Sequence, residues 1–305
     1  MTFRIFKAVA ATFAYLARHW PLLLQAMWLP ALIVAGLQLY AAPHLFSATA
    51  EMVLLGPNPD PETAAAVLSR LGGAIVFYLL AGLVFFPMLT VASLKHIIRG
   101  EEQRLPFYLN YGPDETRIMG ANFLFNLMVV VIALIAEIVV GVFVTAASFA
   151  GPAAAGALRS VGSILSQAAT GWFQLRMSVL FPAVMATRTL GLGVAWDATR
   201  RDWLALIGYW IVIGLVILPA VLILLLPAAL PVAADIASVQ GGDAATVSSF
   251  LQKLSAALSP SAPGFWMTAA AIFVMTLIVN AIVNVASAVA WRYLVAESGI
   301  EADTP

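Results

Sequence analysis

Residues 119–147 read MGANFLFNLMVVVIALIAEIVVGVFVTAA, a continuous apolar run in which Glu137 is the single ionisable residue. About 20 predominantly apolar residues suffice to cross the hydrocarbon core of a bilayer as a helix. A helix that is apolar on every face is buried either in a large protein core or in lipid. This run therefore predicts a transmembrane helix, and with it an integral membrane protein.

The composition of the whole chain agrees with this interpretation. Of its 305 residues, 62% are hydrophobic and 10% are charged, whereas soluble domains have about 25% charged residues. Because so few charges cannot coat a soluble protein of this size, soluble enzymes, nucleic-acid-binding proteins and disordered scaffolds are excluded. The net charge is zero, so no overall field attracts nucleic acid. The chain contains no cysteine, which excludes disulfides, cysteine-ligated zinc and thiol catalysis.

Apolar segments of sufficient length predict an all-α bundle of about six transmembrane helices in a single domain, residues 1–305. The predicted spans are residues 21–42, 71–94, 119–147, 161–186, 204–234 and 264–294. The fifth contains Pro219, Pro227 and Pro231, which predict a kink or an early end. The fourth is the least apolar because polar residues such as Ser166 and Gln167 interrupt it.

Basic residues are concentrated in the connections on one side of these spans. That side carries Arg4, Lys7, Arg18, Lys95, Arg99, Arg104, Arg117, Arg188, Arg200, Arg201 and Arg292. The other side carries Arg70, Arg159 and Lys253, and Arg176 falls inside the fourth span. Because cytoplasmic connections are enriched in Lys and Arg, both termini are expected in the cytoplasm.

The residues before the first span predict an amphipathic helix in the cytoplasmic interface. Its apolar positions recur at helical spacing and are Phe3, Phe6, Ala10, Phe13, Ala17 and Trp20. A plain cytoplasmic extension of the first span is the alternative. The apolar run is full length and no clear cleavage site follows it, so we expect it to be retained rather than removed as a signal peptide.

Two connections on the outer side predict further helices. Asp60, Pro61 and Glu62 have the pattern of a helix beginning, and we expect a short helix there. After Asp243, apolar residues at helical spacing predict a short amphipathic helix; they are Val247, Phe250, Leu251, Leu254 and Leu258. This helix is expected to lie on the outer leaflet, with covering the mouth of the bundle and docking a partner as alternatives.

One cytoplasmic connection combines aromatic and basic residues at Trp196, Arg200, Arg201 and Trp203. The headgroup zone favours this mixture, because aromatic rings lie at the membrane boundary and basic groups bind phosphate. We therefore expect these residues to contact membrane lipids. A docking surface for a cytoplasmic protein partner is the alternative.

Two spans contain the same Phe-Pro pair before a basic connection. Phe86-Pro87 lies in the second span and Phe181-Pro182 in the fourth, and both helices are expected to run inwards. Two such units are typical of a duplicated two-helix element, which places a binding site at its centre. A chance recurrence in apolar sequence is the alternative.

Residues 176–208 resemble a loose superfamily of bacterial multi-span proteins. In that group an arginine-bearing helix ends in a proline, here Arg176 and Pro182, and an Ala-Trp and Thr-Arg-x-x-Trp stretch opens the next span, here residues 195–203. The superfamily includes the YciC-like proteins and the membrane domain of some glycerophosphodiester phosphodiesterases. The resemblance implies an all-helical inner-membrane protein of poorly defined role. Because this sequence contains no catalytic phosphodiesterase domain, neither the activity nor any site residue is transferred to it.

Polar side chains inside the spans are the candidate ligand-binding residues, because lipid penalises charge. On a depth scale of 1.5 Å per residue, Arg176 lies level with Asn280, and Asn126 lies level with Asn284. These four residues predict a polar layer in the inner half of the bundle, either as hydrogen-bond contacts between helices or as a cavity for an anionic or zwitterionic ligand. Glu137 lies nearer the outer boundary and is a fifth candidate.

No catalytic pattern, metal ligand set or cofactor motif is found in the sequence. His19, His44 and His96 are scattered over a span end and opposite sides of the membrane, and no paired carboxylates lie in a span. We expect no enzyme but a scaffold, assembly or envelope-homeostasis factor, with membrane lipids and a membrane or cytoplasmic protein as partners. A transporter or lipid-handling permease that uses the polar layer around Arg176 is the alternative.

Overall fold

The computed structural model describes residues 4–55, 60–101, 108–229, 239 and 243–298. Within these ranges the chain is helical and forms no strand. Its helices are α1 (Ile5–Leu54), α2 (Pro61–Arg99), α3 (Pro113–Ser148), α4 (Pro152–Arg176), α5 (Leu180–Thr187), α6 (Leu192–Thr199), α7 (Trp203–Ala229), α9 (Ala244–Ala257) and α10 (Phe265–Ser298). The expected all-helical fold is therefore confirmed.

Five of the described helices are long and apolar enough to cross a membrane. They are α1, α2, α3, residues Trp203–Leu224 of α7 and residues Phe265–Ala296 of α10. The predicted fourth span, residues 161–186, is instead divided between α4 and α5. Pro182 lies in the first turn of α5, where its missing N–H removes no helical hydrogen bond, so the chain ends one helix at Arg176 and begins another at Leu180.

The beginnings of the first two helices also differ from the expected ones. Residues 5–54 form one continuous helix, so the N-terminal stretch and the first span are not separated by a break. Asp60 accepts a hydrogen bond from the Thr63 backbone N–H at 3.0 Å and begins the long helix α2, rather than a short helix before it. Helix α7 continues past Pro219 and Pro227 to Ala229; Pro231 lies outside the described residues.

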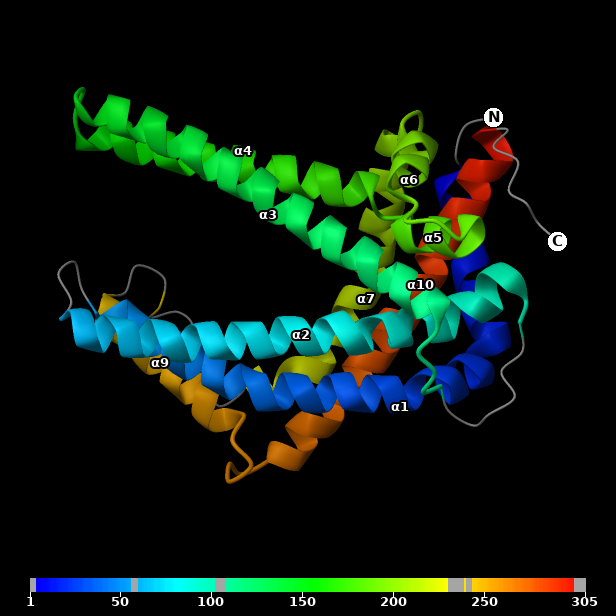
Figure 1. Cartoon of the computed structure of the whole chain (residues 1–305), viewed down its shortest axis with the longest axis horizontal. Coiled ribbons are helices and arrows are strands. Elements are labelled where there is room, and N and C mark those ends of the chain that lie inside the picture. Colours follow the sequence, from blue (N-terminus) through cyan, green and yellow to red (C-terminus); the bar gives the residue numbers. More distant parts are fainter. Residues whose placement is uncertain (1–3, 56–59, 102–107, 230–238, 240–242, 299–305) are drawn as a thin grey trace.

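The predicted amphipathic helix after Asp243 is confirmed as α9. The Asp243 carboxylate accepts the Thr246 backbone N–H at 2.8 Å and caps its first turn. Ser255 of this helix donates a hydrogen bond to the backbone oxygen of Pro43 at 2.9 Å. Helix α9 therefore packs along α1 (Figure 1).

The core lies where α1, α2, α7 and α10 cross, with α5 and α6 against them (Figure 1). Tyr209 of α7 is fully buried, and its hydroxyl lies 2.8 Å from Thr12 Oγ1 of α1 and donates to the Ala286 backbone oxygen of α10 at 2.9 Å. These contacts tie three long helices together at one level, because a buried hydroxyl is costly to leave without a partner.

Helices α3 and α4 form an antiparallel hairpin that leaves this core and projects from it (Figure 1). The rings of Phe125 and Phe173 stack at 5.9 Å, and Gly162 faces Val140 so closely that a Cβ at Gly162 would collide with it. These contacts fix which residues of the two helices are level with each other. The most apolar window of α3 has no residue buried within the chain.

Candidate functional site

Arg176 ends α4 and reaches across to α6. Its Nη2 donates a hydrogen bond to the Trp196 backbone oxygen at 2.6 Å, and its guanidinium lies 4.2 Å from the centre of the Trp196 ring. The Trp172 ring lies 5.8 Å away, and Thr199 donates a hydrogen bond to the Arg176 backbone oxygen at 2.9 Å. The side chain is 4% exposed. Arg176 is thus held between two indole rings, where cation–π contacts stabilise its charge.

The structure does not bring Arg176 into one hydrogen-bonded layer with the three asparagines. Asn126 donates within α3 to the Asn122 backbone oxygen at 2.7 Å, and Asn280 donates within α10 to the Thr276 backbone oxygen at 2.7 Å. Asn284 is buried and donates to Ser93 Oγ of α2 at 2.9 Å. Each of these four residues therefore has its own partner, and the Asn284 contact joins two helices of the core.

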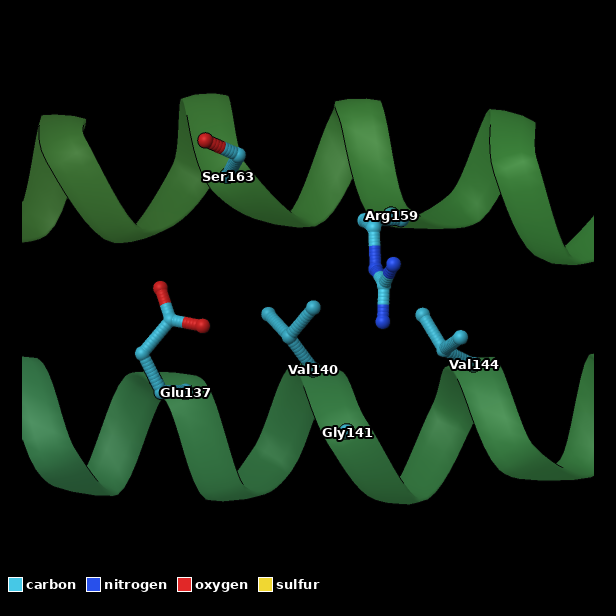
Figure 2. Close-up of a pocket in the computed structure, with 6 residues that line it drawn as sticks. All are labelled: Glu137, Val140, Gly141, Val144, Arg159 and Ser163. Carbon is cyan, nitrogen blue, oxygen red and sulfur yellow. The ribbon is translucent and has the colours of Figure 1, made fainter. Parts of the chain in front are cut away.

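Glu137 lines a groove between α3 and α4 that also contains an arginine. The groove has a volume of about 430 Å³ and is lined by Glu137, Val140, Gly141, Val144, Arg159 and Ser163. Figure 2 shows the Glu137 carboxylate on α3 across the groove from Ser163 on α4, and the Arg159 guanidinium between Val140 and Val144. Both charged side chains are exposed, and neither has an ion-pair partner within the part of the chain that the structure describes.

The groove belongs to a longer polar flank of the hairpin, which we define as Asn126, Glu137, Ser163, Gln167 and Gln174. All five side chains are exposed. Asn126 and Glu137 are about three turns apart on α3, and so are Ser163 and Gln174 on α4, so each pair shares a helix face. Since Glu137 and Ser163 line the same groove, both faces lie on one side of the hairpin. Polar groups thus follow this side along most of its length.

A cluster of ion pairs at the base of the hairpin was not predicted from the sequence. Arg99, at the end of α2, makes two hydrogen bonds to the Asp114 carboxylate at 2.7 and 3.1 Å and also donates to the Met185 backbone oxygen at 3.0 Å. Arg117 contacts the same carboxylate at 3.1 Å. These contacts join α2, α3 and α5.

The same cluster encloses a fully buried carboxylate. Glu115 is 0% exposed and accepts the Gly112 backbone N–H at 2.7 Å and the Tyr108 hydroxyl. Lys95 lies 3.5 Å from Glu115 and donates to the Tyr108 oxygen at 2.8 Å. Burial, followed by the hydrogen bond to the Glu115 carboxylate, raises the pKa of Tyr108 well above its usual range.

A signal for this cluster is present in the sequence. Lys95 and Arg99 share a face at the C-terminal end of one helix, and Asp114 and Glu115 begin the next, so each charge also suits the helix dipole beside it. Each set alone has the pattern of a helix end exposed to solvent. The charges gain partners only because the fold brings these two helix ends together.

The expected interfacial residues divide between two environments. Trp196 and Trp203 are half-buried, Trp196 against Arg176 and Trp172, whereas Arg200 and Arg201 are exposed in the turn between α6 and α7. The two arginines therefore remain accessible to lipid phosphate or to a partner. No group of three or more His, Cys, Asp or Glu side chains suited to a metal ion occurs among the described residues.

Comparisons with protein-family models, with curated proteins and with solved structures give no match to this chain.

Proposed function

We propose that this chain is a multi-pass protein of the bacterial inner membrane that acts without catalysis, as a scaffold, assembly or envelope-homeostasis factor. Its α3–α4 hairpin holds a membrane partner through the polar flank. The observation that carries this proposal is the exposure of Asn126, Gln167 and Gln174 on helices that leave the core. Asn126 donates to Asn122 and Gln167 donates to Ser163 at 3.2 Å within their own helices. The remaining amide donors and acceptors are stabilised at membrane depth by hydrogen bonds to another helix, which lipid tails do not offer.

Six crossings with both termini in the cytoplasm form part of this proposal. Helix α4 has 25 residues, which corresponds to about 37 Å and exceeds the hydrocarbon core of about 30 Å. Because α4 packs antiparallel along α3, it recrosses any membrane that α3 crosses. Its polar flank explains why it is less apolar than the other spans. The basic residues then lie mainly on the cytoplasmic side, and the first turns of α1 extend into that interface.

The transporter or lipid-handling permease has less support. Such a protein would need an open polar layer around Arg176, but Arg176 donates a hydrogen bond to Trp196, and Asn284 donates one to Ser93. These contacts are of the kind that fastens helices to one another, typically about 0.6 kcal/mol each in membranes.

Purification of the tagged full chain in a mild detergent tests the proposal. A stable membrane partner is expected to co-purify with the wild type and with Leu165→Ala, which lies on the opposite, exposed face of α4. The double variant Gln167→Leu/Gln174→Leu is expected to lose it while keeping its melting temperature, because leucine replaces amide hydrogen bonds without opening a core cavity. Loss of the partner from both variants alike, or from neither, contradicts docking on the polar flank.

A further inference from the structure

The groove in the polar flank contains one anion and one cation that do not pair with each other. Glu137 lies on α3 and Arg159 on α4, and both side chains are exposed. Val140 lies between them and packs against Gly162, so it separates the carboxylate from the guanidinium (Figure 2). Both charged groups are therefore available to a partner outside the chain.

Resting on the proposed function, we infer that the partner of the polar flank is a second copy of this chain. Two hairpins pack face to face around a two-fold axis parallel to the membrane normal. Such an interface uses the same surface of both copies, as in the commonest homo-oligomers. A rotation by 180° about an axis along the hairpin places α3 of each copy opposite α4 of the other. The polar groups of α3 must then complement those of α4.

The amides at the inner end of the flank meet this condition. The rings of Phe125 and Phe173 stack, so the next residue on each helix, Asn126 of α3 and Gln174 of α4, is level with the other. The axis leaves depth in the membrane unchanged, so Asn126 of one copy faces Gln174 of the other. The Asn126 amide nitrogen donates to Asn122 within α3, which leaves its oxygen to accept from the Gln174 nitrogen. Contacts of this kind join helices in membranes.

The charges at the outer end of the flank match in the same way. Glu137 and Ser163 line the groove across from each other, so Glu137 of one copy faces the level of Ser163 of the other. Arg159 precedes Ser163 by four residues on α4, which places it about 6 Å nearer the hairpin tip. The long arginine side chain spans this distance and brings its guanidinium to Glu137 of the other copy. The two-fold axis forms this ion pair twice.

These charges favour a second copy over a protein of different sequence. Ion pairs at the outer boundary of the membrane add little to affinity, so the amides hold the helices together and the charges select the partner. A different protein would have to place a cation opposite Glu137 and an anion opposite Arg159, each at the right depth. A second copy presents both by symmetry, because its own groove carries the same two groups.

Co-purification of two differently tagged copies of the full chain in a mild detergent tests this dimer. We expect wild-type copies to associate, and Glu137→Arg or Arg159→Glu alone to lower the associated fraction about tenfold, since each reversal sets like charges opposite each other. Co-expression of the two variants should restore association, because each copy then meets the opposite charge in the other. Pairing within one chain does not give this recovery. Arg70→Glu reverses an exposed charge on the same expected side and should associate as the wild type does.

The recovery also shows that both variants fold. The dimer is overturned if wild-type copies do not associate, if the single reversals associate as well as the wild type, or if the co-expressed variants remain separate while each keeps the wild-type melting temperature. A different membrane protein that co-purifies with the wild type and is lost from Gln167→Leu/Gln174→Leu, without a second copy, overturns the dimer but supports docking on the polar flank. Absence of any co-purifying protein overturns both.

Discussion

Arg176 donates a hydrogen bond to the Trp196 backbone oxygen at 2.6 Å, and its guanidinium lies 4.2 Å from the centre of that indole ring. The two residues belong to α4 and α6, which are separated by the break before Pro182. The contact therefore holds the base of the hairpin to the segment that opens α7. An arginine that stood out in the sequence as a possible ligand-binding group is in this structure a link between two helices.

Removing this link is expected to destabilise the fold. Arg176→Ala loses a charged hydrogen bond and two cation–π contacts, so the free energy of unfolding in mixed micelles should fall by about 2 kcal/mol. Arg176→Lys should recover only part of the loss, since an ammonium cannot stack as a guanidinium does. The control Arg200→Ala removes an exposed arginine nearby and should change stability by less than about 0.5 kcal/mol. An Arg176→Ala variant as stable as the wild type contradicts the structural role.

The ion pair of Arg99 and Asp114 should contribute more than the neighbouring pair of Arg117 and Asp114. Both side chains of the first pair are 14% exposed, whereas that of Arg117 is 34% exposed. Double-mutant cycles with alanine at each position measure the two coupling energies in the same micelles. We expect about 1–2 kcal/mol for the first pair and about 0.5 kcal/mol or less for the second. Equal coupling energies for the two ion pairs would contradict the conclusion that the Arg99–Asp114 pair is the stronger one.

Tyr108 should make stability fall at alkaline pH. Its pKa is raised in the folded state, so it keeps its proton above pH 10 while the unfolded chain loses it. The unfolded state then binds fewer protons, and stability decreases as pH rises. The advantage of the wild type over Tyr108→Phe in unfolding free energy should therefore narrow between about pH 9 and 11. The control Tyr40→Phe, at a 61% exposed position, should show no such trend; a constant wild-type advantage over this range would count against the buried contact with Glu115.

The two Phe-Pro pairs should be coupled energetically. The rings of Phe86 and Phe181 meet edge to face with their centres 5.7 Å apart, so the repeated motif forms a direct contact between α2 and α5. A cycle of Phe86→Leu and Phe181→Leu should give a coupling of about 0.5–1.5 kcal/mol. Phe149, which is 91% exposed, serves as the uncoupled control when paired with either position. The absence of a measurable coupling energy between Phe86 and Phe181 would contradict a stabilising role for this contact, and the recurrence of the Phe-Pro pair would then be a coincidence.

The proposed orientation can be tested by labelling, because the chain has no cysteine of its own. A single cysteine at Ala150, in the turn between α3 and α4, should react with an impermeant maleimide in intact spheroplasts. A cysteine at Arg201, in the turn before α7, should react only after the membrane is opened. Labelling of both positions from the same side contradicts an odd number of crossings between them.

The all-helical fold could be predicted from the sequence, because the length of each apolar run is enough to predict a membrane-spanning helix. Residues 119–147 lie within α3 and residues 265–294 within α10, and the helix cap at Asp243 follows from residue type and spacing. The break after Arg176 could not be predicted, because Pro182 lies within one continuous apolar run of the sequence although it belongs to the first turn of a new helix in the structure.

The candidate site was less predictable because depth along a helix says nothing about rotation around it. Arg176 and Asn280 were placed at equal depth, yet their hydrogen bonds lead to different helices. The groove could not be predicted for the same reason: the sequence places Arg159 in an outer connection, whereas in the structure it lies within α4 and points toward α3. In an antiparallel hairpin, residues at the same level on the two helices come into contact. Which residues of α3 and α4 are level can be worked out only when the position of the turn between them is known.

The central claim, that the polar flank of the hairpin docks a partner in the membrane, is tested most directly by photocrosslinking in native membranes. A photoreactive residue replaces Gln167 on the flank or, for comparison, Leu165 on the opposite face of α4. We expect a discrete protein adduct from position 167, absent in the Gln174→Leu background, and only lipid adducts from position 165. Lipid adducts alone at both positions, or the same proteins at both, would contradict the claim.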